Sequence, residues 1–371
     1  MDRASTILYD VPVIETNIGW PFKEVLTMSG EYRFSFGPWN IHEGADPFGP
    51  TVRRGVTFAK KLKMYKKLGF DGVQFHDDDA VPDMNKLSPK DITKAAKDVY
   101  KALKDEGLTA EFVAPRLWED PRTIDGGYTS NDPDARQYAK ERSRRAIDIA
   151  VALNTKLIVL WLAREGTYIR EAKDPKVATD RLVEAIDDML DYNADIKIAI
   201  EPKPNEPMDQ AYIPTTGHAL ALGYLTKDES RVGVNIETAH VILAGLDPSD
   251  EMGFALAYDK LYTVHLNDQN GLKFDEDKSF GSVNLRRAFN QVRVLDKYNF
   301  GARGEFVGLD VKAMRSQKQE MATKHLTNSR TIFLRLVELV RSLDRARVDQ
   351  LIADRDYEEL DMLIVSHLMG R

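Results

Sequence analysis

The stretch IKIAIEPK, residues 196–203, is rich in apolar and β-branched residues and ends in Glu201-Pro202-Lys203. Short runs of this kind are typical of strands that are buried on both faces of a parallel sheet. Seven more runs repeat the pattern at fairly even spacing and bring the number of predicted strands to eight. They are YRFSFGPW (32–39), GVQFHD (72–77), TAEFVAP (109–115), KLIVLW (156–161), VGVNIE (232–237), LYTVHLN (261–267) and FGARGEF (300–306).

Amphipathic stretches lie between these strands and predict helices. One of them begins with Ser88 as an N-cap and Pro89 in the first turn. The clearest stretches are residues 57–68, 88–103, 135–153 and 175–192. Eight strands that alternate with helices favour an α/β fold, and eight is the number that closes a (β/α)8 TIM barrel. The alternative is an open doubly wound sheet, but its glycine-rich phosphate loop is not found after the first strand.

Composition and charge exclude several classes of function. The 371 residues include 52 basic and 59 acidic side chains, which gives a formal net charge of −7. A mildly acidic chain argues against binding to nucleic acid or to an anionic membrane surface. The lack of cysteine excludes disulfides, thiolate catalysis and thiolate metal ligands. No apolar run reaches the roughly 20 residues of a membrane helix and no leader is visible, so we expect a cytoplasmic location.

Three parts are expected along the chain. Residues 1–30 form an N-terminal extension, residues 31–312 form the catalytic barrel, and residues 313–371 form a C-terminal helical extension for subunit contacts. The last 28 residues, 344–371, mix charged positions with Leu and Met. A tail of this kind either wraps a neighbouring subunit or is a loosely packed terminal extension.

Candidate chemistry gathers at the ends of the expected strands, and in a TIM barrel the carboxyl ends of the strands carry the active site. Four consecutive strands are followed there by polar side chains. They are Glu201 with Lys203, Glu237 with His240, His265 with Asp275 and Asp277, and Asp310 with Lys312. Carboxylates brought together in a buried site repel one another, and bound divalent cations are the natural counter-charge.

The number of ligands suggests two metal ions. The first ion can be surrounded by groups from four adjacent strands, namely Glu201, Glu237, His265 and Asp310. The second can be held by His240, Asp275 and Asp277, with Glu237 as a bridge. Oxygen-rich sets with an imidazole suit Mg²⁺, Mn²⁺ or Co²⁺. The alternative is a buried salt-bridge network with Lys203 and Lys312, but the seven acidic or imidazole groups outnumber these two lysines.

Further residues at strand ends are candidates for substrate contact. His76 beside Asp79 is either an acid/base pair, in which the carboxylate fixes the tautomer, or a hydrogen-bonded strand end. Three tryptophans either wall a sugar site or pack the top of the barrel; they are Trp39, Trp118 and Trp161. Lys312 is a further candidate for substrate binding.

The motifs and their order resemble the shorter class of the xylose isomerase family over about residues 32–340. The matching segments begin with FSFGPW (34–39) and DPFG (46–49). They continue with GVQFHDDD (72–79), DGGYTSNDP (125–133), WLAREG (161–166), EPKPNEP (201–207), PTTGHALA (214–221), VGVNIETAH (232–240), NDQNGLKFDEDKSFG (267–281) and LDVKAMR (309–315). The combination of FHDDD, EPKPNEP and FDED is highly specific.

This resemblance implies a (β/α)8 barrel whose C-terminal extension embraces another subunit in a homotetramer, with a homodimer as the alternative. It also implies the interconversion of an aldose and a ketose with two divalent metal ions. By position, the first ion would be held by Glu201, Glu237 and Asp310, and the second by Glu237, His240, Asp275 and Asp277.

The resemblance further implies roles in the handling of the sugar. His76 with Asp79 would assist ring opening, and Lys203 would hydrogen-bond the carbonyl oxygen. Aromatic rings would complete the site, with Trp39 and Trp161 as its walls and Phe48 reaching into the site of a neighbouring subunit.

The chain departs from the family pattern at three places. His265 lies in VHLN where the family has IDLN, so an imidazole replaces a carboxylate ligand. A histidine on that strand resembles the sites of L-rhamnose isomerase and ketose 3-epimerases. Trp118 lies in RLWEDP (116–121), where the family has Phe, and a shorter first loop has His42-Glu43 in place of a second Trp.

We therefore expect a metal-dependent isomerase of an unphosphorylated sugar, with D-xylose to D-xylulose by a 1,2-hydride shift as the first candidate reaction. Divalent ions would stabilise negative charge on both sugar oxygens, Lys203 would add a positive donor, and aromatic walls would exclude water. His265 and Trp118 motivate the alternative of an isomerase or epimerase of a different sugar. A catalytically silent sugar-binding homologue is the third hypothesis.

Overall fold

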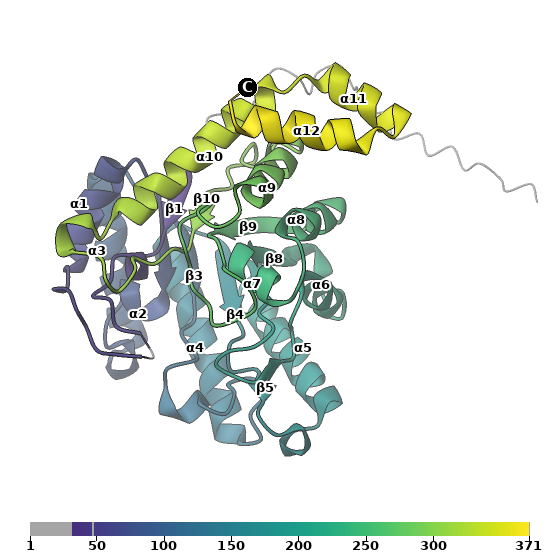
Figure 1. Ribbon diagram of the computed structural model, residues 1–371. Coiled ribbons are helices and arrows are strands. Elements are labelled where there is room, and N and C mark those ends of the chain that lie inside the picture. Colours follow the sequence, from purple (N-terminus) through teal and green to yellow (C-terminus); the bar gives the residue numbers. More distant parts are fainter. Residues whose placement is uncertain (1–31, 47, 371) are drawn as a thin grey trace, which may run out of the picture.

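Eight parallel strands close into a barrel in the order β1-β10-β9-β8-β6-β4-β3-β2 (Figure 1). The computed structural model describes residues 32–46 and 48–370, so the predicted N-terminal extension, residues 1–30, lies outside the described residues. The barrel strands are β1 (Phe34–Phe36), β2 (Gly72–His76), β3 (Thr109–Ala114), β4 (Leu157–Trp161), β6 (Lys197–Glu201), β8 (Val232–Glu237), β9 (Leu261–Leu266) and β10 (Val307–Leu309). The predicted (β/α)8 TIM barrel is confirmed.

One long helix follows each barrel strand and covers the outside of the sheet. These helices are α1 (Phe58–Leu68), α3 (Pro89–Asp105), α4 (Pro133–Ala152), α5 (Pro175–Tyr192), α6 (Thr216–Tyr224), α8 (Pro248–Ala257), α9 (Leu285–Lys297) and α10 (Lys324–Ser342). As predicted, Ser88 caps α3, because its side chain accepts a hydrogen bond from the Asp91 backbone N–H. The shorter elements are α2 (Asp77–Ala80), α7 (Thr238–Leu243), and the two-stranded sheet of β5 (Gly166–Thr167) and β7 (Gln210–Ala211).

The eighth strand lies later in the chain than the sequence pattern predicts. The run at 300–306 is a turn, and the strand begins only at Val307. Gly301 and Gly304 have φ values of +99° and +97°, which are left-handed conformations that do not occur within a strand. The Gly304 N–H donates to the Gly301 carbonyl oxygen and closes this turn. The prediction of a strand at 300–306 was therefore wrong, although the number of strands was right.

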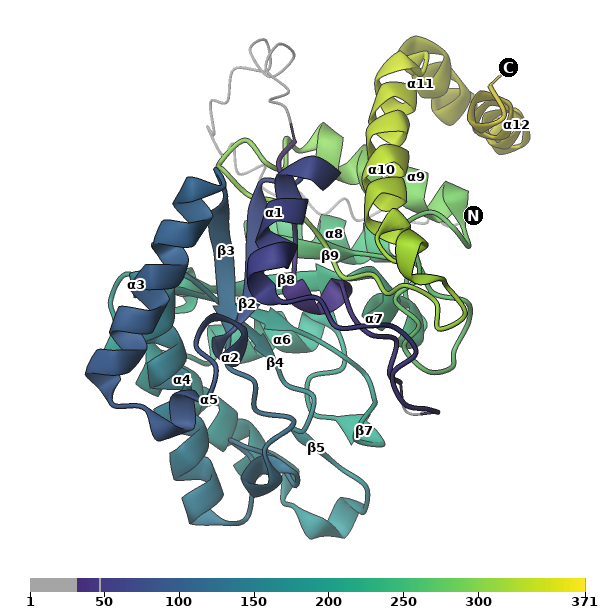
Figure 2. The ribbon, with the colours of Figure 1, turned by 90° about the vertical axis from the view of Figure 1, so that its left-hand side faces the viewer.

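The chain beyond the barrel strands divides into one packed helix and a protruding pair. Helix α10 buries Leu326, Phe333 and Leu336 in the main hydrophobic core. Helices α11 (Arg345–Asp354) and α12 (Tyr357–Leu368) lie beyond α9 and α10, at one end of the molecule (Figures 1 and 2). The Leu339 carbonyl lies 2.8 Å from a ring nitrogen of His367, which ties α12 to α10. None of the helices in the described ranges is long and apolar enough to cross a membrane.

A buried ion pair holds the start of α2, directly after strand β2. The guanidinium of Arg142, on α4, donates two hydrogen bonds of 2.7 Å to the two carboxylate oxygens of Asp77. Both side chains are almost fully buried, at 5% and 0% exposed. Because Asp77 follows His76 in the chain, this pair links the outer helix to the end of a barrel strand where candidate site residues lie.

We predict that Arg142→Ala lowers the free energy of unfolding by about 3–5 kcal/mol, because it leaves the Asp77 carboxylate buried without its partner. A matched control lies on the same helix. Arg144 pairs with Asp188 but is 42% exposed, so Arg144→Ala should cost only about 0–1 kcal/mol. Denaturant unfolding of both variants measures the difference, and equal losses would contradict the structural role of the buried pair.

Candidate functional site

The register of the barrel sheet places two of the predicted ligands side by side. Glu237 at the end of β8 pairs with His265 on β9, and His265 pairs with Gly308 on β10. A Cβ atom at Gly308 would lie 2.5 Å from the Gln74 side-chain nitrogen and 2.4 Å from the Val264 carbonyl oxygen. Only glycine fits this position, and the side chains of the neighbouring strands fill the space that it leaves.

Glu201, Glu237 and His265 form the first cluster, in which one ligand atom of each lies within 4.8 Å of the others. His265 Nδ1 lies 3.3 Å from Glu201 Oε2 and 3.6 Å from Glu237 Oε2. All three side chains are buried. The imidazole that replaces a carboxylate in the sequence therefore faces the two neighbouring acids.

Glu237, His240 and Asp275 form a second cluster on the same geometric criterion. His240 Nε2 lies 3.2 Å from Glu237 Oε1 and 3.2 Å from Asp275 Oδ2. His240 comes from α7, directly after β8, and Asp275 comes from the loop after β9. Glu237 belongs to both clusters, in the bridging position that the sequence predicts.

Asp277 and Asp310 lie beside these clusters and have other partners. Asp277 forms an ion pair with Lys312 and accepts a hydrogen bond of 3.0 Å from the Asn267 side chain. Asp310 accepts a hydrogen bond of 3.0 Å from the Trp39 ring N–H and one of 2.7 Å from Asn40. The structure thus brings five of the seven predicted ligands into two clusters and holds the other two with neighbouring donors.

The charges at this end of the barrel do not balance within the described residues. Lys203 Nζ lies 2.9 Å from Asp275 Oδ2, and Lys312 pairs with Asp277. Among residues 32–46 and 48–370, no Arg or Lys side chain forms an ion pair with the other three carboxylates, which are those of Glu201, Glu237 and Asp310. A salt-bridge network with the two lysines therefore neutralises only part of the cluster.

The uncompensated charge shifts the proton affinity of the site. Burial, and after it the neighbouring carboxylates, raise the pKa of Glu237 well above its ordinary value. Burial and Asp275 raise the pKa of Asp277 to about 8. Burial disfavours the charged form of His265, but Glu201 and other acids outweigh it and raise the pKa of the imidazole to about 9. The raised pKa values therefore favour protons on these three side chains, and a bound cation would compete with those protons.

The donor atoms of the two clusters fit a divalent cation. Within the described residues, four buried ligand atoms have no hydrogen-bond partner: His265 Nδ1 and Nε2, His240 Nδ1 and Asp275 Oδ1. Buried polar groups without partners are costly, and an ion supplies the missing partner for several of them at once. Carboxylate oxygens with one imidazole per cluster form the kind of set that binds Mg²⁺ or Mn²⁺.

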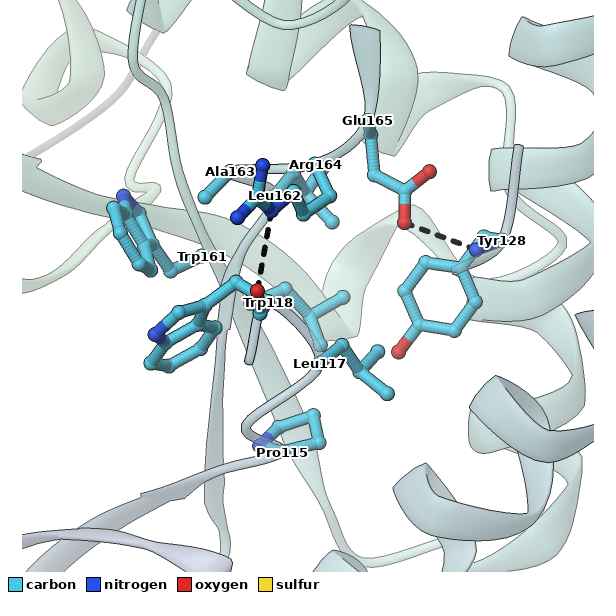
Figure 3. A pocket seen from close by; sticks show the side chains of 10 residues that line it. Pro115, Leu117, Trp118, Tyr128, Trp161, Leu162, Ala163, Arg164 and Glu165 are labelled. Atoms are coloured by element: carbon cyan, nitrogen blue, oxygen red, sulfur yellow. Dashed lines mark hydrogen bonds between the residues drawn. The ribbon is translucent and has the colours of Figure 1, made fainter. Parts of the chain in front are cut away.

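Aromatic side chains line the neighbouring strand ends. The ring centroids of Trp39 and His76 are 4.1 Å apart, and those of Trp118 and Trp161 are 4.5 Å apart at 82°. Figure 3 shows these two indoles beside Arg164, whose side chain donates to the Trp118 carbonyl oxygen. The Lys203 ammonium lies 5.2 Å from the centre of the Trp161 ring. The three predicted tryptophans therefore form a row with His76, and Trp161 lies beside the lysine that contacts Asp275.

Two cavities adjoin these groups and differ greatly in size. The pocket behind Trp118 and Trp161 (Figure 3) has only about 10 Å³, room for at most one water molecule. A second cavity of about 760 Å³ is lined by Asp275 and Lys312, and it is within the range of roughly 300–1,000 Å³ found for ligand sites. Phe48 lies at its edge, 75% exposed and 5.5 Å from Phe274 of the same chain.

His76 and Asp79 are close enough to interact, with His76 Nδ1 2.9 Å from Asp79 Oδ2. Arg116 was not singled out from the sequence, yet its Nη2 lies only 2.6 Å from the same His76 nitrogen. Two asparagines were also missed: Asn235 donates to Glu201 at 2.6 Å, and Asn267 donates to Glu237 at 3.0 Å. Their signal in the sequence is an amide side chain inside or directly after an apolar strand.

We predict that Mn²⁺ binds more tightly as the pH rises from about 6 to 9, because His265, Asp277 and Glu237 have raised pKa values and must lose protons to act as ligands. Calorimetry in two buffers of different ionisation enthalpy measures the protons that are released on binding.

Two variants sharpen the measurement of Mn²⁺ affinity. Glu237→Gln removes the shared carboxylate and should weaken binding by at least about tenfold. Glu165→Gln changes a buried acid that belongs to neither cluster and accepts hydrogen bonds from the backbone N–H groups of Gly127 and Tyr128, so it should leave the affinity unchanged. An affinity that does not vary with pH, without proton release, would show that these groups do not hold the ion.

Comparison with known proteins agrees with the architecture. The family described as xylose isomerase-like TIM barrel matches residues 62–301. A D-tagatose 3-epimerase-like protein shares the fold with a TM-score of 0.61 and 16% identity, over 83% of this chain and 98% of that chain. D-psicose 3-epimerase from Clostridium cellulolyticum H10 has a TM-score of 0.58 and 13% identity, over 82% of this chain and 99% of that chain. The 3-keto-D-glucoside 4-epimerase YcjR from E. coli has a TM-score of 0.57 and 15% identity, over 81% of this chain and 100% of that chain.

At identities this low, the structural likeness establishes the shared fold. The family match is broader evidence, because it covers more than half of the sequence and contains all but the first and the last of the barrel strands. The chain belongs to the xylose isomerase-like TIM barrel family.

Proposed function

We propose that the protein is a metal-dependent sugar isomerase or epimerase, which moves a hydrogen at a carbon beside a carbonyl group. The observation that carries this proposal is the pair of buried clusters that share Glu237, with the Lys203 ammonium beside the second cluster. The sugar epimerases named among the similar folds support the class of substrate.

Two divalent ions, Mg²⁺, Mn²⁺ or Co²⁺, are part of the proposal. Glu201, Glu237 and His265 would hold one ion, and Glu237, His240 and Asp275 would hold the other. Asp277 and Asp310, whose carboxylates lie beside the clusters, stay predicted ligands. When bound, such ions supply Lewis-acid stabilisation of the negative charge that develops on sugar oxygens.

Lys203 is suited to donate a hydrogen bond to the carbonyl oxygen of the substrate. Burial disfavours its charge, but Asp275, Glu206 and Glu237 outweigh burial and raise the pKa of Lys203 above its ordinary value. The group therefore stays an ammonium ion at neutral pH and acts as a positive donor rather than as a base. The Trp161 ring beside it shields this donor from water on one side.

The aromatic side chains supply walls rather than chemistry. Trp39, Trp118 and Trp161 present flat apolar surfaces of the kind that pack on the C–H faces of a sugar. By excluding water, they would keep a hydrogen that moves between carbon atoms from exchanging with solvent. Lys312, Phe48 and the cavity of about 760 Å³ would contact the parts of the substrate that do not react.

The first specific candidate is the interconversion of D-xylose and D-xylulose by a 1,2-hydride shift. The second candidate is an epimerisation of a ketose or keto-sugar, and the imidazole of His265 beside Glu201 and Glu237 favours it. A catalytically silent sugar-binding role is disfavoured because Lys203, His76 and Asp79 are all present. The homotetramer or homodimer and the cytoplasmic location stay predictions.

We predict that the Mn²⁺-loaded protein converts at least one sugar of a panel that contains D-xylose, D-glucose, D-fructose and D-tagatose. The reaction is run in D₂O and the product is analysed by NMR. A hydride shift retains protium at the reacting carbon, whereas an epimerisation that proceeds by proton transfer introduces deuterium. The label therefore distinguishes the two candidate reactions.

A pair of lysine variants tests the assignment of the active lysine in the same assay. Lys203→Met should lower kcat by roughly 10²–10³-fold, the usual effect of removing a donor to a developing oxyanion. Lys140→Met removes a partly exposed lysine of α4 that pairs with Glu184 and lines neither the cavity nor the clusters, so it should have little effect. If the metal-loaded protein leaves every sugar of the panel unchanged, the proposed function is wrong for these substrates.

A further inference from the structure

Arg116 contacts His76, whose ring lies beside those of Trp39 and Trp118. It follows β3, and its guanidinium contacts the ring of His76 and two carboxylates of α2. Arg116 Nη2 lies 2.6 Å from His76 Nδ1 and 3.3 Å from Asp79 Oδ1. Arg116 Nε donates to Asp78 at 2.8 Å, and Nη1 donates to Glu119 at 3.1 Å. Each of these contacts uses a different N–H bond of the guanidinium.

The hydrogen-bond partners of His76 Nδ1 decide whether this nitrogen carries a proton. A guanidinium has only N–H donors and a carboxylate has only acceptors, so Nδ1 cannot satisfy both Arg116 and Asp79. If Nδ1 carried a proton for Asp79, that N–H would point against the N–H bonds of Arg116 across 2.6 Å. If Nδ1 is unprotonated, its lone pair can accept a hydrogen bond from Arg116. The shorter contact favours the unprotonated nitrogen.

Other hydrogen bonds hold the Asp79 carboxylate near the ring of His76. Its Oδ2 accepts a hydrogen bond of 3.2 Å from the His76 backbone N–H, and its Oδ1 accepts from Arg116. The distance of 2.9 Å from Asp79 Oδ2 to His76 Nδ1 is therefore explained by the turn at the start of α2. It does not require a proton between the two groups.

We propose that Arg116 is a positioning residue that holds His76 in the tautomer with its proton on Nε2. In the described part of the chain, His76 Nε2 has no hydrogen-bond partner, so it is the nitrogen left for a ligand. The rings of Trp39 and Trp118 flank the imidazole, with centroids 4.1 and 5.0 Å from its own. His76 thus offers the pocket a hydrogen-bond donor.

The position of Arg116 is itself fixed by the buried pair described above. The Arg116 backbone N–H donates to Asp77 Oδ1 at 3.2 Å, and Asp77 is held by Arg142. The ion pairs with Asp78, Asp79 and Glu119 then fix the direction of the guanidinium. The tautomer of His76 is therefore set by a chain of contacts that reaches from α4 to the mouth of the barrel.

On the proposed function of a sugar enzyme, this tautomer decides which atoms of a sugar His76 can contact. A base at this position would need a lone pair on Nε2 to take the proton of an anomeric hydroxyl group. An Nε2–H group instead donates to an acceptor such as a carbonyl, ring or glycosidic oxygen. The site then suits a sugar that presents such an oxygen to His76, and His76 is not the base that removes the anomeric proton.

The test is the tautomer of His76 in the metal-free and sugar-free protein, so its result does not depend on turnover. Two-bond ¹H–¹⁵N correlation spectra of ¹⁵N-histidine protein at pH 7.5 distinguish the tautomers, and the spectrum of His76→Gln assigns the signal among the seven histidines. We expect a neutral ring with the proton on Nε2. A proton on Nδ1, or on both nitrogens, would overturn the proposal.

Variants separate the two neighbours of His76 Nδ1. In Arg116→Met the competing donor is lost, so the proton should move to Nδ1 and face Asp79. In Asp79→Asn the Nε2–H tautomer should persist. Arg164→Met is the matched control, because Arg164 donates to the Trp118 carbonyl and, among the described residues, does not contact His76, so it should leave the His76 signal unchanged. If Asp79→Asn shifts the tautomer and Arg116→Met does not, Asp79 is the true partner and the proposal is wrong.

Discussion

The crowding of carboxylates at one end of the barrel is the constraint on which the rest of the site depends. Strand register pairs Glu237 with His265, Glu201 at the end of β6 lies close to both, and the loop after β9 adds Asp275. In the part of the chain that the structure describes, two lysines oppose this charge, and they pair with Asp275 and Asp277. The raised proton affinity of Glu237 and His265 and the buried atoms without partners both follow from this imbalance. A pair of divalent cations would remove both.

A second set of contacts, outside the acidic clusters, orients the aromatic wall. Asp77 links Arg142 on the outer helix α4 to the backbone of Arg116, and Arg116 reaches His76. Basic side chains thus have two different roles at this end of the barrel. Two lysines partly neutralise the acids of the clusters. Beside the tryptophans, Arg116 decides which nitrogen of His76 faces a ligand.

The sequence predicted the barrel because buried parallel strands have a strong local signal, as in residues 196–203. It misplaced the eighth strand, because an apolar run at 300–306 cannot reveal that Gly301 and Gly304 form a turn. The clusters were predictable because residues at the ends of neighbouring parallel strands must meet. Arg116 was missed because its meaning depends on a distance of 2.6 Å to a histidine 40 positions away in the chain.

The central claim, that the carboxylate clusters hold two divalent ions with imidazole ligands, is tested most directly by pulsed EPR of the Mn²⁺-loaded protein. The account predicts two ions per chain that are coupled to each other, with ¹⁴N coupling from His240 and His265. In His265→Asp one of the two nitrogen couplings should disappear while both ions stay bound. Binding of a single ion, or of ions without nitrogen coupling, would contradict the account.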